Sequence, residues 1–320
     1  MVGKSFTLDE TIELTGLTKS RIRYLETRCP KILNRSLFSP YNDRYSLSQI
    51  KNFKDLNISI NSADLRAEEL VAKGNKKQKV ISFASGKGGV GKTSLSVNLS
   101  ILGASKENET IFFDGDLGMA DAHILLGVKS SKNLTNLFNN GDSLKELIIK
   151  SHSNLEFISG GNGFLELADL DDLSLIRLKE QLTFLQEDHD YLVIDLPAGI
   201  GKGVLSFIAF ADELVVVVTP SPSSMLDSYG LIKSVLLRGF EGEIKVIANM
   251  VASQQAGLEA FVALDNCANK FLDAKLTYLG AVRKDLSFER ALIKGTPLVV
   301  MNEFSLASKN MKRIADKLFT

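Results

Sequence analysis

The stretch "KVISFASGKGGVGKTSLSVNLSILGA", residues 79–104, joins an apolar segment to a glycine-rich loop and then to a segment with helical character. Its centre, "GKGGVGKT" at residues 86–93, satisfies the pattern G-x-x-x-x-G-K-[ST]. Glycines in such a loop let backbone N–H groups converge on phosphate oxygens, and the N-terminus of the following helix adds its positive dipole end. A preceding strand and a following helix are the context that this pattern requires. The stretch therefore predicts a phosphate-binding loop.

Each residue type in this loop has an expected task. Lys92 supplies a point charge to the terminal phosphates, and the Thr93 hydroxyl is a candidate ligand for Mg²⁺. Lys87 is a second lysine for which the sequence offers no task within the chain, so a merely solvated lysine is the alternative. The residues that we expect to cradle the nucleotide are Gly86, Lys87, Gly88, Gly89, Val90, Gly91, Lys92, Thr93 and Ser94.

Apolar segments alternate with amphipathic ones from residue 79 to residue 320. The predicted strands cover residues 79–84, 110–116, 155–160, 191–197, 213–219, 244–250 and 276–282. Their near-continuous Val and Ile runs indicate strands that are covered on both faces. The sequence therefore predicts an α/β fold of the P-loop NTPase class, with a doubly wound, mostly parallel sheet.

Aspartates follow two of these predicted strands. "FFDGD" places Asp114 and Asp116 at a strand's C-terminal end, and "YLVIDLPAG" does the same for Asp195. Ligands of open α/β sheets bind at the C-terminal ends of the strands. An acid at such a position holds Mg²⁺, directly or through water, in nucleotide hydrolases. Thr93, Asp114 and Asp195 are therefore the candidate metal ligands.

The motifs K-G-G-x-G-K-[ST] at 87–93, D-G-D at 114–116 and D-x-P-A-G at 195–199 resemble those of the deviant Walker A ATPases, which include MinD and ParA. The resemblance covers residues 79–320 and implies use of ATP and Mg²⁺. In that family the first lysine crosses a dimer interface and contacts the partner's ATP, which implies an ATP-dependent homodimer with Lys87 acting across it. It further implies that Asp116 positions the attacking water and that Asn249 reads the adenine, with Lys87, Lys92 and Asp116 as catalytic residues.

Two further stretches are similar to the FlhG (FleN) branch of that family, which regulates flagellar number and placement. The first, "DGDLGMADAHILLG" at 114–127, is similar to MinD and FlhG alike, and the second, "TPSPSSMLDSYGLIK" at 219–233, is more similar to FlhG. Members that carry iron–sulfur clusters need cluster cysteines, and the chain has only Cys29 and Cys267, far apart in sequence. The segment "DLRAEELV" at 64–71 keeps only two positions of the element that engages an FlhF-like GTPase, so this contact has little support.

The N-terminal residues 1–57 are predicted to form a separate helical module, joined by a linker with a short helix at 58–78 to the ATPase domain at 79–320. "TLDE" at 7–10 is a capping box, and "TKSRIRYLETR" starts a second helix after a glycine turn. Together with "NDRYSLSQIKNF" they resemble the winged helix-turn-helix of MerR-type regulators. The resemblance implies DNA contacts by Lys19, Ser20, Arg21 and Arg23 from the second helix and by Arg44 and Tyr45 from the wing.

The distribution of charge along the chain indicates which partner the N-terminal module binds. Lys+Arg and Asp+Glu both number 38, but residues 1–60 hold ten basic against six acidic residues, which suggests a nucleic-acid-facing module. A protein-docking adaptor is the alternative for this module.

No signal peptide or membrane-length apolar run is present, so a cytoplasmic protein is expected. The stripe Ala307, Met311, Ile314 and Leu318 predicts a helix that closes the sheet rather than a membrane anchor.

Three functions stay open at this point. The resemblance favours a dimerising Mg-ATPase switch that regulates the position or number of a cell structure such as the flagellum. An ATP-controlled MerR-like transcriptional regulator is the second reading, with the ATPase as its dimerisation sensor. A ParA-like DNA-partitioning ATPase is the third.

Overall fold

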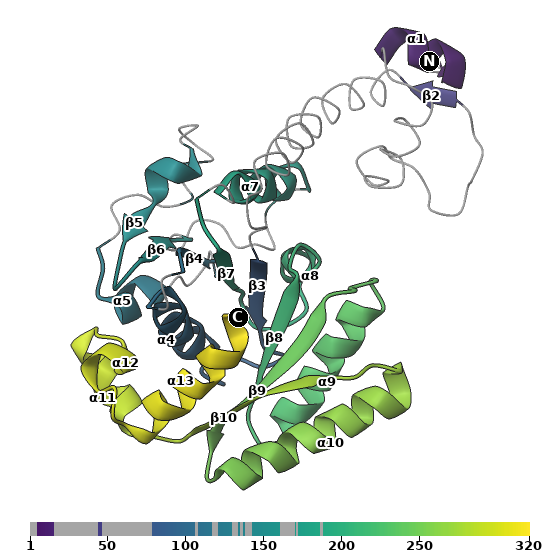
Figure 1. Ribbon diagram of the computed structural model, residues 1–320. Helices are drawn as coiled ribbons and strands as arrows, with labels where there is room; N and C mark the ends of the chain where they lie inside the picture. Colours follow the sequence, from purple (N-terminus) through teal and green to yellow (C-terminus); the bar gives the residue numbers. More distant parts are fainter. Residues whose placement is uncertain are drawn as a thin grey trace. The chain divides into compact units, whose positions relative to one another are not determined.

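The structure, a computed structural model, divides the chain into two compact units, residues 1–75 and 76–320 (Figure 1). Each unit is described by itself. The predicted module boundaries at residues 57 and 78 stay a prediction. The residues that the structure describes are 5–15, 44–46, 79–105, 108–116, 121–129, 134, 137, 143–160, 170, 172–185 and 188–320.

The first unit contains a short strand pair and a capped helix. Strand β1 (Ser5–Thr7) pairs antiparallel with β2 (Arg44–Ser46), and helix α1 (Leu8–Thr15) follows β1 directly. The amide of Thr7 donates to Glu10 Oε2 at 2.7 Å, and the amide of Glu10 donates to Thr7 Oγ1 at 3.3 Å. This reciprocal pair confirms the predicted capping box. The predicted second helix, residues 47–57 and the linker lie outside the described residues.

The second unit is built on one mixed sheet, in which the described residues form eight strands in the order β10-β9-β8-β3-β7-β4-β6-β5. All neighbouring pairs are parallel except β5 with β6. The doubly wound, mostly parallel sheet is thereby confirmed. The strands are β3 (Lys79–Ala84), β4 (Thr110–Asp114), β5 (Ile149–Lys150), β6 (Leu155–Ile158), β7 (Tyr191–Asp195), β8 (Glu213–Val218), β9 (Glu243–Val251) and β10 (Thr277–Arg283).

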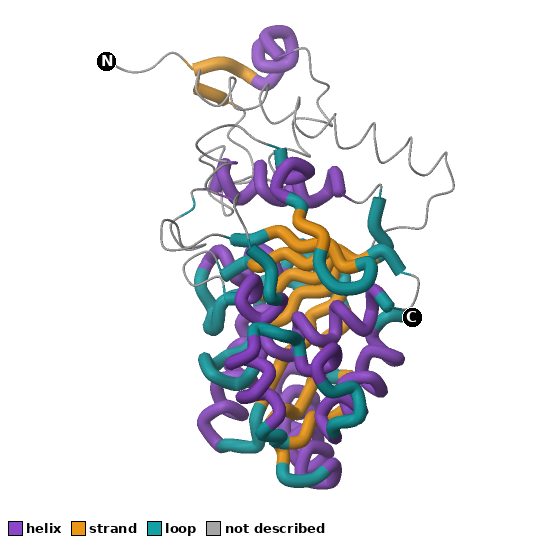
Figure 2. The backbone as a smooth tube through the Cα atoms, turned by 90° about the vertical axis from the view of Figure 1, so that its left-hand side faces the viewer, coloured by secondary structure: helices purple, strands orange, loops and turns teal. Residues whose placement is uncertain are grey.

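Helices cover both faces of this sheet, and Figure 2 shows the strands running through the middle of the unit with helices around them. The helices of the second unit whose bounds lie within the described residues are α4 (Lys92–Ala104), α5 (Ala122–Leu126), η1 (Leu144–Leu147), α7 (Asp172–Phe184), α8 (Lys202–Ile208), α9 (Pro222–Leu236), α10 (Gln254–Leu272), α11 (Ser287–Lys294), α12 (Leu298–Met301) and α13 (Leu306–Leu318). Within the described residues, no helix is long and apolar enough to cross a membrane.

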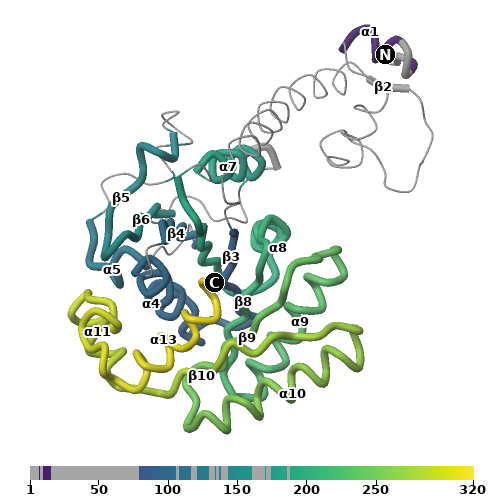
Figure 3. Tube along the Cα trace, viewed as in Figure 1, coloured from purple at the N-terminus to yellow at the C-terminus, as the bar shows by residue number. Residues whose placement is uncertain are grey.

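Alternate residues of the central strands β3, β4, β7 and β8 enter two separate cores. Ile81 and Phe83 of β3 pack with α4 and α13 on one face, whereas Val80 and Ala84 pack with α7, α8, α9 and α10 on the other. This alternation is the period of two that a strand buried on both faces requires. In Figure 3 the green segment from β8 to β10 shows α9 and α10 as the connections between successive parallel strands.

The last helix, α13, closes the first of these cores. The predicted stripe Ala307, Met311, Ile314 and Leu318 is buried throughout, and α13 packs against β10 and α4. Because its apolar face is already covered by the sheet, the prediction of a closing helix is confirmed. The phosphate-loop region 79–104 and the aspartates at 114 and 195 meet at the C-terminal ends of β3, β4 and β7, where the candidate site lies.

Candidate nucleotide-binding site

The glycine-rich loop connects β3 to α4 and is fixed by its neighbours. Gly91 adopts φ +82°, in the left-handed region that favours glycine, and a Cβ there would lie 2.5 Å from Asn249 Nδ2. A Cβ on Gly86 would overlap the backbone carbonyl of Asp227 in α9. By contrast, a Cβ on Gly88 or Gly89 would meet open space. The two ends of the loop are therefore packed against α9 and β9, while its middle faces outward.

Two residues of the loop motif converge on Asp195 at the end of β7. Lys92 Nζ lies 2.9 Å from Asp195 Oδ2, and the Thr93 hydroxyl donates to the same oxygen at 2.7 Å. Asp195 is fully buried and Lys92 is 8% exposed, so this is a desolvated ion pair. The structure thus brings together three residues that the sequence placed in one site.

A third donor to Asp195 comes from outside the predicted motif. Ser96, one helical turn after Thr93, donates its hydroxyl to Asp195 Oδ1 at 2.9 Å. Nothing in the spacing of the motif singles out this serine. Its i+3 relation to Thr93 on a helix is the signal that places both hydroxyls on one face.

Asp114 lies beside Asp195, because the two residues are register partners on β4 and β7. Its carboxylate accepts the amides of Asp116 and Ala122, each at 3.2 Å. Burial is the main cause that raises the pKa of Asp114 well above its usual range, and the negative charge of Asp195 raises it further. The carboxylate therefore holds the backbone that carries Asp116, and its role as a metal ligand stays a prediction.

Two other predicted residues surround the loop. Asn249 is buried on β9, and its side-chain amide donates to the carbonyl of Val90 at 2.8 Å, so it holds the backbone of the loop in place. Asp116 is partly exposed after the end of β4. The prediction that Asn249 reads adenine and that Asp116 positions water stays a prediction for both residues.

The structure gives Lys87 a hydrogen-bond partner within the chain, which the sequence did not indicate. Its ammonium group donates to Ser223 Oγ, in the first turn of α9, at 2.8 Å. Both side chains are exposed. The sequence could not indicate this contact because Ser223 lies 136 residues away, and the packing of Gly86 against α9 brings it to the loop.

Comparison with known proteins identifies the family to which this loop belongs. The profile of the family described as "ParA: NUBPL iron-transfer P-loop NTPase" matches residues 76–319. The chain belongs to the ParA/MinD family of P-loop ATPases. Its glycine-rich loop is therefore that of a P-loop ATPase, and which residues contact the nucleotide stays a prediction.

Individual relatives agree with this assignment. The antiactivator FleN of Pseudomonas aeruginosa is 32% identical over 241 residues, which cover 75% of this chain and 85% of FleN. The flagellum site-determining protein YlxH of Helicobacter pylori is 32% identical over 247 residues, or 77% of this chain and 83% of YlxH. The septum site-determining protein MinD of Pyrococcus horikoshii, solved with Mg-ADP, matches the fold with a TM-score of 0.62 at 23% identity, covering 75% of this chain and 96% of that one.

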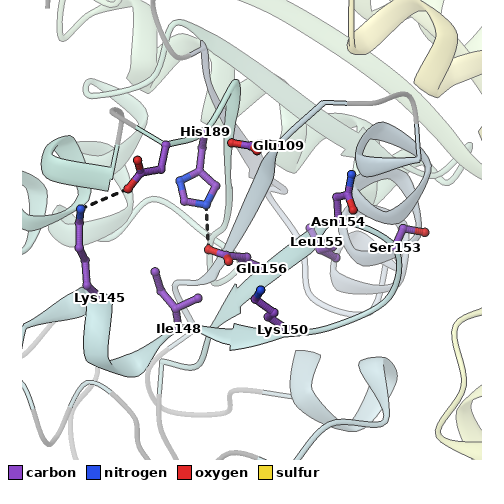
Figure 4. Close-up of a pocket in the computed structure, with 10 residues that line it drawn as sticks. Glu109, Lys145, Ile148, Lys150, Ser153, Asn154, Leu155, Glu156 and His189 are labelled. Atoms are coloured by element: carbon purple, nitrogen blue, oxygen red, sulfur yellow. Dashed lines mark hydrogen bonds and ion pairs between the residues drawn. The ribbon is translucent and has the colours of Figure 1, made fainter.

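A hollow of about 780 Å³ lies elsewhere in the ParA/MinD-type unit (Figure 4). It is lined by Glu109, which precedes β4, and by His189, which precedes β7, so it lies at the N-terminal ends of these strands. Figure 4 shows Glu156 and His189 pointing toward one another, with His189 Nε2 2.9 Å from Glu156 Oε2. The phosphate loop is at the opposite ends of the strands, so this hollow is no part of the nucleotide site.

The predicted DNA-contacting residues belong to the first unit. Lys19, Ser20, Arg21 and Arg23 lie outside the described residues. Arg44 and Tyr45 lie on β2, opposite Thr7 and Phe6 of β1. Their place on a two-stranded ribbon is compatible with the predicted wing, and their contact with DNA stays a prediction.

Proposed function

We propose that this ParA/MinD-family ATPase is a switch that dimerises when it binds ATP and Mg²⁺ and returns to the monomer on hydrolysis. The proposal is supported above all by the exposed Lys87 at the outward-facing middle of the phosphate loop. A second cation at this place neutralises transition-state charge when it is supplied by another subunit, as an arginine finger does.

The surface around the loop also favours a second copy of the chain. Three large apolar side chains stand exposed next to it: Ile200 at 54%, Leu226 at 70% and Met250 at 44%. Leu226 is one turn after Ser223, the partner of Lys87, and Met250 Cε would lie 3.3 Å from a Cβ on Gly91. Gly199, before Ile200, donates its amide to the carbonyl of Ser85 at 2.9 Å. Apolar groups that ring a charged centre are typical of a protein–protein contact surface.

Thr93 of α4 and Asp195 at the end of β7 fit the magnesium ion that accompanies ATP. Mg²⁺ binds through hydroxyl and carboxylate oxygens together with the phosphates of its nucleotide. The Thr93 hydroxyl and the Asp195 carboxylate are 2.7 Å apart and supply these two oxygen types. The ion supplies charge neutralisation at the phosphates, and in the proposal Lys92 binds the terminal phosphates, Asp116 orients water and Asn249 contacts the adenine.

The cellular output that we propose is control of the number or position of flagella. It is supported by the similarity to FleN, an antiactivator, and to YlxH, a flagellum site-determining protein. Deletion of the gene in its own organism should change the number or position of flagella, counted by electron microscopy. Unchanged flagella would instead favour the DNA-partitioning or transcriptional readings.

Sedimentation tests the switch directly. The Asp116→Ala protein, in which we expect hydrolysis to be blocked, should be a monomer with ADP and a dimer with ATP and Mg²⁺. Adding Lys87→Ala should spare ATP binding but abolish the dimer, because Lys87 is proposed to act across the interface. A monomer with ATP at high protein concentration would refute the switch.

A second function rests on the first unit, whose basic excess and β-ribbon favour DNA as its partner. Helix-turn-helix proteins usually read two half-sites through a dimer, so the ATP-bound dimer would supply the second copy. We therefore expect DNA affinity to rise with ATP, to fall with Lys87→Ala and to weaken with salt. Fluorescence anisotropy of genomic DNA fragments measures this affinity. The variant Arg21→Ala plus Arg23→Ala should lose DNA binding but keep ATPase activity. No binding at low salt would assign the unit to protein docking.

A further inference from the structure

Asp195 is held by more than the residues of the nucleotide motif. One of its oxygens, Oδ2, takes both donors that belong to the motif, Lys92 and Thr93. The other oxygen, Oδ1, accepts from Ser96 at 2.9 Å. Because Ser96 and Asp195 are both 0% exposed, water cannot replace this donor if it is lost.

We infer that Ser96 is a positioning residue for the magnesium site: it fixes the rotation of the Asp195 carboxylate, so that Oδ2 faces Thr93 and the phosphates. The inference rests on the proposed function in one respect, namely that Thr93 and Asp195 hold the magnesium ion of the nucleotide. The terminal torsion of an aspartate is broad and roughly two-fold, so the side chain alone does not fix which oxygen points where.

The geometry of α4 explains why Ser96 can do this. A residue three positions after Thr93 lies on the same helix face, one turn further on. Its hydroxyl lies 3.0 Å from the carbonyl of Thr93 and 2.9 Å from Asp195 Oδ1. A hydroxyl has one hydrogen, and the charged carboxylate is the stronger acceptor. Ser96 therefore gives its hydrogen to Asp195 Oδ1, while its oxygen lies beside the Thr93 carbonyl.

Partners that orient metal ligands affect metal affinity even though they do not touch the metal. Loss of such a partner typically costs between ten- and a hundredfold in metal affinity or activity. For Ser96→Ala we expect about a tenfold loss in apparent Mg²⁺ affinity, at the lower end because Lys92 and Thr93 still hold Oδ2. Nucleotide affinity without magnesium should stay unchanged, since Ser96 is directed at the carboxylate and not at the phosphate loop.

A matched control lies one turn further along α4. Ser100 is also 0% exposed, and its hydroxyl donates to the carbonyl of Ser96 at 2.7 Å. It has the same size and burial as Ser96, and its hydroxyl bonds this helix carbonyl rather than Asp195. Ser100→Ala therefore reports what loss of a buried serine hydroxyl in this helix does by itself.

Binding of a fluorescent ADP analogue to the full chain, in EDTA and over a Mg²⁺ titration, tests the inference without hydrolysis or dimerisation. The expected result is a shift of the Mg²⁺ midpoint to higher concentration in Ser96→Ala, with Ser100→Ala like the wild type and with all three proteins equal in EDTA. An unshifted midpoint in Ser96→Ala, or an equal shift in Ser100→Ala, would overturn it.

Two further outcomes separate this inference from the proposed function. If the wild-type affinity for ADP does not depend on Mg²⁺, the proposed role of Asp195 in binding magnesium is refuted. The positioning role of Ser96 is then refuted as well. A missing ATP-dependent dimer, by contrast, would refute the switch and leave this measurement valid.

Should Ser96→Ala fail to fold, Ser96→Thr and Ser96→Cys replace it. The threonine keeps the hydroxyl and should hold Mg²⁺ more tightly than the cysteine, a weak donor; equal midpoints would contradict the role of Ser96.

Discussion

Lys87 of the phosphate loop donates a hydrogen bond to Ser223 of α9, with 2.8 Å between Nζ and Oγ. Both groups are exposed, so the bond contributes about 1 kcal/mol net. Such a contact holds the lysine in one place but is weak enough to be exchanged for a charged phosphate. In the monomer, Ser223 thus binds the Lys87 ammonium group that the proposed dimer needs at its interface.

Removing the Ser223 hydroxyl should make the ATP dimer easier to form. In the Asp116→Ala background, Ser223→Ala should lower the dimer dissociation constant by a few-fold, about the value of one exposed hydrogen bond. Sedimentation equilibrium with ATP and Mg²⁺ measures this change. The gain should vanish when Lys87→Ala is added, because Ser223 then has no lysine to hold; a gain of the same size without Lys87 would mean that the hydroxyl acts in another way.

The buried ion pair between Lys92 and Asp195 makes a separate prediction for the nucleotide-free protein. Lys92→Ala leaves the Asp195 charge buried with only hydroxyl donors, which should lower the free energy of unfolding by about 3 kcal/mol. The double variant Lys92→Ala plus Asp195→Asn should regain part of this loss, since no uncompensated charge remains. Urea unfolding measures both, and a double variant less stable than the single one would contradict the prediction. Weak nucleotide binding by Lys92→Ala would then have two causes, a lost phosphate contact and a destabilised site.

The sequence was sufficient to predict the phosphate loop and the sheet because each produces a recognisable pattern within a short stretch of residues. The loop has fixed spacing, and fully buried strands such as β8 are continuous apolar runs. Strand β5 was not predicted, since two residues, Ile149 and Lys150, carry no such pattern. Ser96 and Ser223 could not be assigned either, because their roles depend on which residues of β7 and of the loop the fold brings within reach.

Asp114 predicts how stability varies with pH. Its folded-state pKa is raised, chiefly by burial and then by the charge of Asp195, so the folded chain binds this proton more tightly than the unfolded chain. Ionisation of Asp114 therefore costs no stability below the unfolded pKa of about 3.9 and costs progressively more as the pH rises toward the folded pKa. Thermal unfolding of nucleotide-free wild type and Asp114→Asn in EDTA measures the effect. The difference in melting temperature should move in favour of the variant as the pH rises above about 4. A difference that is constant, or that moves the other way, would exclude this role for the buried carboxyl.

The apolar side chains beside the loop predict where the second copy docks, and α9 offers a test with an internal control. Leu226 in its first half is 70% exposed near Lys87, and Leu237 just past its end is 75% exposed, about 16 Å further along the helix axis. An exposed leucine replaced by aspartate changes stability little at either place. In a symmetric dimer the same patch is used twice, so burial of Leu226 counts in both copies.

Leu226→Asp should therefore weaken the ATP dimer by at least about tenfold, the equivalent of one buried leucine side chain at about 1.5 kcal/mol. Leu237→Asp should leave the dimer unchanged. Sedimentation of each variant in the Asp116→Ala background, with ATP and Mg²⁺, gives the two dissociation constants. Binding of a fluorescent ATP analogue, measured alongside, should be alike in both, because neither leucine is among the residues that we expect to contact the nucleotide. Equal weakening by the two substitutions would mean that the dimer contacts the whole length of α9, and no weakening by Leu226→Asp would move the interface away from the phosphate loop.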